Sequence, residues 1–285
     1  FMLDRTTARM HAAVDPYPNI DPATLAETKW VEYRARDGLS LRAYLTLPKG
    51  RDARSLPLIV MPHGGPFARD HWEFDPLVQL LANRGYAVIQ PQFRGSTGYG
   101  KDFVASGYGE FGIKMQDDLD DSVAWLAAQR IIDPKRVCMI GSSYGGYAAI
   151  WASIRNPNIY RCAVSYAGVF DLPQQLSYNR KTFSAVRYFR DWRDKVDGRG
   201  TRNLGEVSPL KFPNRVAIPV LIGHGEKDST VPASQSRRMV EALRDARVPV
   251  QSVFYPKAGH GFSRSEDQLD WYRRIEAFLA KYNPS

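Results

Sequence analysis

The chain has 285 residues, enough for one large hydrophobic core or for one core with a small appendage. Its 44% hydrophobic and 24% charged residues are ordinary for a globular protein, and no apolar stretch approaches the roughly 18 residues of a membrane-spanning helix. The net charge of +9 raises the question of a nucleic-acid partner. The densest basic stretch, 180–202, also carries aromatic residues but no nucleic-acid-binding motif. We therefore expect no membrane span and no nucleic-acid partner, and interpret 180–202 as a solvated helix face or a surface that meets another domain.

The first residues lack the basic region and apolar segment of a signal peptide. This favours a cytoplasmic location, while a periplasmic or secreted one stays open because the native start can lie upstream. Cys138 and Cys162 lie in apolar, strand-like runs and are predicted to be buried thiols, neither a disulfide framework nor a metal site. The five histidines show no metal-binding spacing, so no metal or other cofactor is expected.

The periodicity predicts one α/β domain over 25–285, after an arm over 1–24 that is interrupted by Pro16 and Pro18. Two strands come first, 30–35 and 39–47, joined by a turn at Asp37-Gly38. Strands and helices then alternate, which predicts a doubly wound, mostly parallel sheet with antiparallel N-terminal edge strands. The predicted strands are 58–61, 86–90, 136–140, 161–166, 218–222 and 250–255, and the helices lie near 74–84, 116–129, 144–155, 233–246 and 266–281.

Two segments need a separate interpretation. Residues 171–210 join two predicted strands and are longer than one helix requires, so we expect an insertion that forms the pocket wall or a lid over the catalytic end of the sheet. Four aspartates near the start of helix 116–129 are interpreted as charges that suit the helix dipole, and not as a metal cluster. They are Asp117, Asp118, Asp120 and Asp121.

Ser143 is the most informative single residue. It occupies the centre of Gly141-Ser142-Ser143-Tyr144-Gly145, a G-x-S-x-G motif between a predicted strand and a predicted helix, which is the context of a nucleophile elbow. Glycines are expected at 141 and 145 because side chains there would collide with the neighbouring strand and helix. The alternative interpretation is a simple turn.

The chain order Ser, acid, His of this elbow class predicts the two partners. Asp228 follows the predicted strand 218–222 and His260 follows 250–255, so both lie in loops at the carboxyl ends of strands. An imidazole must take the serine's proton, and a carboxylate must hold that imidazole in the right tautomer. Glu226 and Asp171 remain weaker alternatives for the acid. The other histidines, His11, His71 and His224, are interpreted as surface, packing or structural residues.

A glycine-rich loop, His63-Gly64-Gly65-Pro66, follows the predicted strand 58–61. Acyl transfer builds negative charge on a carbonyl oxygen, which N–H donors must stabilise. The backbone N–H of Tyr144 is expected to supply one donor, and this loop the other.

Together these motifs resemble the catalytic α/β-hydrolase domain of the prolyl oligopeptidase family of serine peptidases, and most of all its acylaminoacyl-peptidase and dipeptidyl-peptidase branches. The likeness runs from about residue 25 to the end. The stretches that carry it are Arg36-Asp37-Gly38, Leu45-Thr46-Leu47-Pro48, the His63 loop, Gln90-Pro91-Gln92-Phe93-Arg94-Gly95-Ser96-Thr97-Gly98-Tyr99-Gly100, Met115-Gln116-Asp117-Asp118, Gly141 to Tyr147, and the Asp228 and His260 loops.

The resemblance implies a serine peptidase that hydrolyses short peptides through a Ser143–His260–Asp228 triad and an acyl-enzyme. A carboxylesterase on small acyl esters is the alternative. It implies a substrate pocket lined by Val231, Val169, Phe170 and Tyr147, with no cofactor. It also implies a preceding β-propeller of the same native chain, of which the arm 1–24 would be the last strands and the linker. A homo-oligomer is left open.

Overall fold

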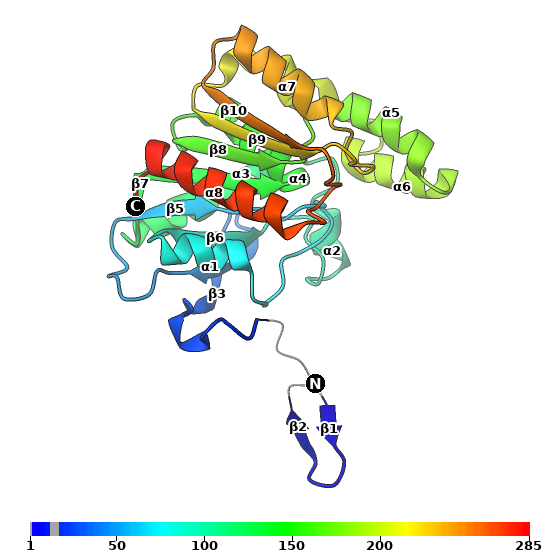
Figure 1. Cartoon of the computed structure of the whole chain (residues 1–285). Helices are drawn as coiled ribbons and strands as arrows, with labels where there is room; N and C mark the ends of the chain where they lie inside the picture. The colour runs from blue at the N-terminus through cyan, green and yellow to red at the C-terminus, as the bar shows by residue number, and fades with distance from the viewer. Residues whose placement is uncertain (1, 12–16) are drawn as a thin grey trace.

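The structure is a computed structural model and describes residues 2–11 and 17–285. At its centre is an eight-stranded sheet of order β10-β9-β8-β7-β5-β6-β4-β3 (Figure 1). The strands from β5 to β10 pair in parallel, and the β3–β4 hairpin adds the antiparallel edge. The doubly wound, mostly parallel sheet predicted from the sequence is therefore confirmed. The strands are β3 (Thr28–Arg34), β4 (Ser40–Thr46), β5 (Leu56–Val60), β6 (Ala87–Gln92), β7 (Ile132–Ser142), β8 (Cys162–Tyr166), β9 (Val220–Gly225) and β10 (Val250–Tyr255).

Helices cover both faces of the sheet and enclose two apolar layers (Figure 1). One layer packs under α1 (Pro76–Asn83) and α8 (Ser265–Tyr282). The other packs under α3 (Lys114–Ala128), α4 (Tyr144–Arg155) and α7 (Ser234–Asp245). The buried strands β5 and β8 have no exposed residue, which explains why the sequence shows them as continuous apolar runs and not as alternating ones. None of the helices within 2–11 and 17–285 has the length and apolar character needed to cross a membrane.

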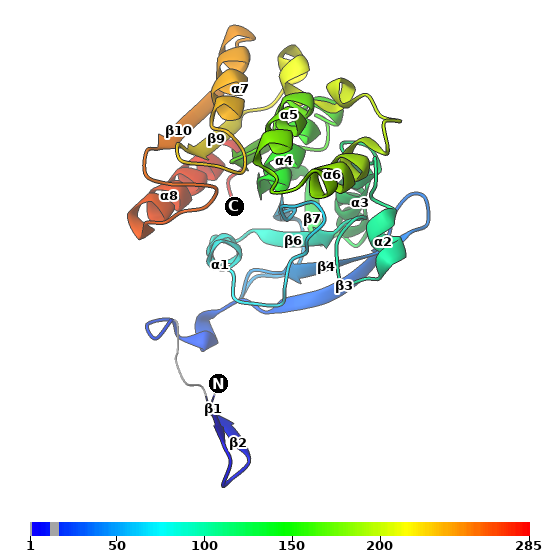
Figure 2. The ribbon, with the colours of Figure 1, turned by 90° about the vertical axis from the view of Figure 1, so that its right-hand side faces the viewer.

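The remaining elements lie outside the central sheet. The arm contains a two-stranded antiparallel sheet, β1 (Met2–Asp4) with β2 (Arg9–His11), while Phe1 and residues 12–16 lie outside the described residues. The short helix α2 (Lys101–Ala105) was not predicted. The segment 171–210 contains two helices, α5 (Leu172–Thr182) and α6 (Val186–Asp197), which lie beside α4 (Figure 2).

The prediction of free thiols was wrong, because Cys138 and Cys162 form a disulfide. They are direct register partners on the neighbouring strands β7 and β8, with Cα atoms 4.8 Å apart, a distance that a disulfide can bridge. Both are fully buried. Sequence spacing could not show this, since 24 residues and a whole helix separate the two cysteines along the chain.

The dipole interpretation of the aspartates on α3 holds only for Asp117, the one that lies in the first turn. Asp118 is buried and takes two hydrogen bonds from the Arg94 guanidinium, at 2.6 and 2.8 Å. Asp120 is buried against the Tyr160 hydroxyl at 2.7 Å. Burial raises the pKa of both carboxyls to about 6, against the opposing effect of these partners. These acids are internal anchors of the helix. No cluster of acids, histidines and cysteines that could hold a metal ion occurs in the part of the chain that the structure describes.

Candidate active site

Ser143 lies at the turn between β7 and α4, with φ of 57° and ψ of −119°. This conformation is strained for a residue with a side chain, and the surrounding structure holds it. The Ser143 amide donates to the Tyr166 carbonyl at 2.9 Å. Side chains at Gly141 and Gly145 would collide with the backbone of α4 and with the carbonyl of Pro62, which accounts for the spacing of the motif.

Asp228 and His260 meet at the same edge of the sheet, because both follow the carboxyl ends of neighbouring parallel strands, β9 and β10. His260 Nδ1 lies 2.7 Å from Asp228 Oδ2. The other oxygen, Oδ1, accepts the backbone N–H groups of Thr230 at 2.8 Å and Val231 at 2.9 Å. Burial works to raise the pKa of Asp228, but the hydrogen bonds from His224, His260 and Val231 outweigh it and hold this pKa below its usual value. The carboxylate is therefore ionised at neutral pH.

The side chain of Ser143 and the second ring nitrogen of His260 are free to react. Among the described residues, neither Ser143 Oγ nor His260 Nε2 has a hydrogen-bond partner. Catalytic hydrogen bonds are often long in an enzyme without substrate and shorten when the substrate binds. The ring of His260 is 31% exposed, so a substrate can reach it.

The alternative acids lie elsewhere. Asp171 caps the N-terminus of α5, accepting from the Gln174 amide at 3.1 Å, and pairs with Arg238. Glu226 forms an exposed ion pair with Arg237. His11 and His71 are exposed, whereas His224 is fully buried beneath Asp228.

The loop over 63–65 lies against the nucleophile. A Cβ built on Gly64 would sit 4.0 Å from Ser143 Oγ. His63 is buried and stacks on Phe93, with Nδ1 2.7 Å from the Gly64 carbonyl oxygen and Nε2 2.8 Å from Ser96 Oγ. Because a carbonyl oxygen only accepts, Nδ1 carries the proton and the ring fixes the Gly64–Gly65 peptide. Burial lowers the pKa of His63 to about 4, so the ring stays neutral at physiological pH.

Further along the same loop, Asp70 is an unusual acid. Its Oδ2 atom is buried with no hydrogen-bond partner among the described residues. Burial, followed by the charges of Asp75 and Glu73, raises the pKa of Asp70 to about 7. This group therefore titrates near neutral pH.

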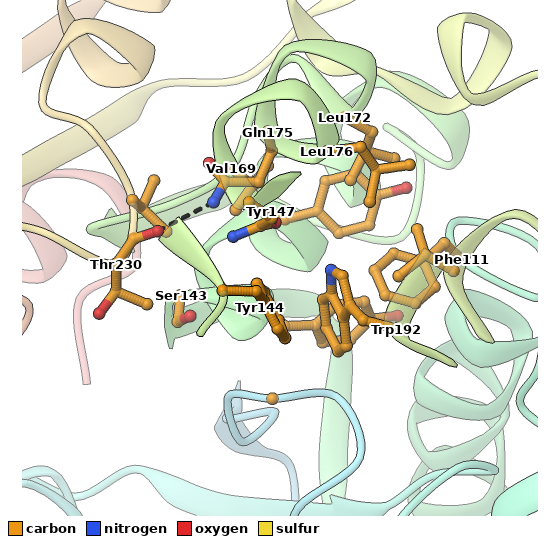
Figure 3. Close-up of a pocket in the computed structure, with 15 residues that line it drawn as sticks. Phe111, Ser143, Tyr144, Tyr147, Val169, Leu172, Gln175, Leu176, Trp192 and Thr230 are labelled. Carbon is orange, nitrogen blue, oxygen red and sulfur yellow. Dashed lines mark hydrogen bonds between the residues drawn. The ribbon is translucent and has the colours of Figure 1, made fainter. Parts of the chain in front are cut away.

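A cavity of about 220 Å³ opens beside Ser143 (Figure 3). Three of the predicted pocket residues line it: Tyr147, Val169 and Val231. Phe170 does not, because the structure places it fully buried in the core, with its ring packed against Gly168. The remaining lining residues include Gly65, Phe111, Tyr144, Leu172, Gln175, Leu176, Asn179, Phe183, Trp192, Val196 and Thr230.

The segment 171–210 was expected from the sequence to form a pocket wall or a lid, but the residues of α5 and α6 that line the cavity were not identified. Leu172, Gln175, Leu176 and Asn179 recur at helical spacing and share one face of α5. That spacing was the signal that could have found them. The Gln175 amide donates to the Thr230 carbonyl at 2.9 Å, which ties α5 to the loop of Asp228 (Figure 3).

Comparison with known proteins agrees with this geometry. The sequence profile described as "Prolyl oligopeptidase family" matches residues 72–284. The chain belongs to the prolyl oligopeptidase family. Dipeptidyl aminopeptidase BIII of Pseudoxanthomonas mexicana is 36% identical over 292 residues, covering 99% of this chain and 42% of that protein. The acylamino-acid-releasing enzyme of Rattus norvegicus is 28% identical over 259 residues, covering 85% of this chain and 34% of that protein.

Solved structures of other peptidases share the fold. A structure described as a Mycobacterium tuberculosis puromycin-hydrolyzing peptidase superposes with a TM-score of 0.85 at 26% identity, over 93% of this chain and 41% of that one. The α/β-hydrolase fold expected from the motifs is thus confirmed. The chain spans less than half the length of the relatives it matches.

Proposed function

We propose that this chain is the catalytic domain of a serine peptidase that hydrolyses short peptides, of the dipeptidyl- or acylaminoacyl-peptidase kind. The observation that carries the proposal is the His260–Asp228 pair, which leaves Nε2 free at the edge of the sheet where Ser143 stands on its strained turn. Membership of the prolyl oligopeptidase family and the names of the relatives support it.

In this proposal His260 takes the proton of Ser143 as the oxygen attacks the scissile carbonyl. Asp228 holds His260 in the tautomer with its proton on Nδ1 and stabilises the imidazolium that forms. His260 then gives the proton to the leaving amine, and water hydrolyses the acyl-enzyme by the same route in reverse.

The oxyanion is stabilised by two backbone N–H groups. Tyr144 is the first residue of α4, so its N–H has no partner within the helix. The second donor is the N–H of Gly65. Carbonyl and N–H point in opposite directions across a trans peptide, so fixing the Gly64 carbonyl towards His63 turns this N–H to the other side. Within the described residues, the Gly65 N–H has no other acceptor.

The cavity holds the side chain of the residue whose carbonyl is cleaved. Its lining is mainly apolar and aromatic, with no charged group among the lining residues. An apolar cavity of roughly 150 Å³ holds a benzene molecule, so about 220 Å³ accommodates one large apolar side chain such as phenylalanine or leucine.

Substrate length is set outside the described residues in this proposal. The relatives are more than twice as long as this chain, which is consistent with a β-propeller of the same native protein that precedes the domain. Under this reading β1 and β2 (residues 2–11) belong to its last strands.

The test compares amide and ester substrates that share one acyl group, with phenylalanine as the acyl residue. The proposal predicts measurable amide hydrolysis that is lost in Ser143→Ala and kept in Ser142→Ala, and no effect of chelators. The same assay is run on a longer protein that includes upstream residues. Hydrolysis of the ester but not of the amide by both proteins would favour the carboxylesterase.

A further inference from the structure

His224 is a fully buried histidine directly behind the proposed catalytic acid. It lies on β9, four residues before Asp228, and no catalytic role was assigned to it from the sequence. In the structure its Nε2 lies 3.2 Å from Asp228 Oδ2, the same oxygen that faces His260. The same carboxylate oxygen therefore faces two imidazoles, the buried ring of His224 and the partly exposed ring of His260.

The surroundings of His224 determine its tautomer. Nε2 is hydrogen-bonded to the Val231 carbonyl oxygen at 2.9 Å and also faces Asp228 Oδ2 at 3.2 Å; both atoms only accept, so Nε2 carries the proton. Nδ1 lies 2.6 Å from Ser236 Oγ on α7, and this hydroxyl donates to it. Every polar atom of the ring is thus satisfied by a neutral imidazole with its proton on Nε2.

This arrangement completes the coordination of Asp228. A carboxylate offers about four acceptor sites. Oδ1 accepts the N–H groups of Thr230 and Val231, Oδ2 lies 2.7 Å from His260 Nδ1, and His224 Nε2 lies 3.2 Å from the same Oδ2. Without His224 the Oδ2 atom would keep only His260 as a donor, and the carboxylate would be held less firmly.

We propose that His224 is a positioning residue for catalysis: its Nε2–H, bonded to the Val231 carbonyl oxygen and 3.2 Å from Asp228 Oδ2, helps to hold Asp228 and stabilises the negative charge on the oxygen that faces His260. The proposal rests on the proposed function, since it assigns His224 to the same triad. Removing this donor leaves more negative charge beside His260, which favours the protonated form of His260. A protonated His260 cannot accept the proton of Ser143, so activity at low pH falls.

The other titratable groups that face this site leave the argument unchanged. Burial, then the charges of Asp228 and Asp267, raises the pKa of the Tyr166 phenol, so Tyr166 stays neutral throughout the pH range of the test. Glu226 is exposed and paired with Arg237.

The chain offers a matched pair of variants. In His224→Asn the amide reaches only to the position of Nδ1, so contact with Ser236 is kept and the donor to Asp228 is lost. In His224→Gln the amide nitrogen reaches the position of Nε2, so the donor is kept. For His224→Asn we expect kcat to fall about tenfold, the range for one hydrogen bond to a charged group, and the acid limb of kcat/KM to move up by about 0.5 to 1 pH unit. In His224→Gln the limb should stay at its wild-type position.

The proposal is overturned if the acid limb of the kcat/KM profile does not move in His224→Asn, or if it moves equally in both variants. A purely structural role of His224 would lower stability without a difference between the two variants in this pH profile. A second measurement covers the case in which His224→Asn does not fold. ¹⁵N NMR of the histidine rings in the wild-type protein should show the His224 proton on Nε2, and a proton on Nδ1 would overturn the proposal. The NMR result does not depend on turnover. A wild-type protein that shows the predicted tautomer but hydrolyses neither amide nor ester would therefore count against the peptidase. It would also count against the positioning role of His224, since there would be no catalytic triad to position.

Discussion

Filling the cavity beside Ser143 should change which substrates are cleaved without damaging the catalytic groups. Val169 lines this cavity, is 9% exposed, and has no part in the hydrogen bonds of Asp228 and His260. In the wild-type protein a phenylalanine side chain buried in the cavity gains up to about 3 kcal/mol over an exposed one. At roughly 1.4 kcal/mol for each factor of ten, kcat/KM should favour phenylalanine over alanine at the cleaved residue by about 100-fold.

Val169→Phe places a phenyl ring where that substrate ring would bind. The preference for phenylalanine over alanine should fall from about 100-fold to near unity, because the lost term is the burial of the substrate ring. Val169→Ala, which widens the cavity, should keep most of the preference. The assay is kcat/KM on two peptide amides that differ only at this residue. An unchanged preference in Val169→Phe would refute the assignment of the cavity. An equal loss on both substrates, with slower labelling of Ser143 by a small fluorophosphonate, would instead show damage to the triad.

Three further predictions concern the catalytic groups and the buried acid. Ser143→Ala and His260→Ala should each lower kcat by about 10⁴-fold or more with the fold intact, and the double variant should lose little beyond either, since the residues act as a unit; losses that multiply would refute the shared mechanism. Asp228→Asn should lower kcat by about 10⁴-fold by allowing the wrong tautomer of His260, and a rate within tenfold of wild type would exclude Asp228 as the acid. The pKa of Asp70 is raised to about 7 in the folded protein, so the folded state holds this proton more tightly than the unfolded state does. The free energy of unfolding that Asp70 contributes is therefore present at low pH and is lost as the pH rises through that value. Asp70→Asn removes this group, so the free energy of unfolding should fall less between pH 5 and pH 8 in the variant than in the wild-type protein. Urea unfolding at several pH values measures this, and an unchanged slope would contradict it.

The sequence was most informative where local rules operate. The elbow glycines, the order Ser143, Asp228, His260 and the apolar strands were predictable, because a tight turn and a parallel sheet each restrict the residues that can occupy them. In the structure Asp228 and His260 are hydrogen-bonded, and Ser143 lies on the strained turn between β7 and α4.

Features that depend on contacts across the fold were not predictable. The disulfide needs the register of β7 against β8, and the buried partners of Asp118 and Asp120 come from distant segments. His224 had no sequence signal of its own, because its meaning depends on which oxygen of Asp228 it faces. Phe170 was placed in the pocket only because it follows a strand, and in the structure its side chain is buried in the core.

The central claim is that Ser143 is the nucleophile of a peptidase, and one measurement tests it most directly. One sample of folded protein is treated with a fluorophosphonate alone, a second is treated first with a peptide chloromethyl ketone ending in phenylalanine and then with the fluorophosphonate, and the adducts are mapped by mass spectrometry. The account predicts a single fluorophosphonate adduct on Ser143, absent in Ser143→Ala and kept in Ser142→Ala, and blocked in advance by the chloromethyl ketone through His260. No adduct in folded protein, or an adduct that persists in Ser143→Ala, would contradict it.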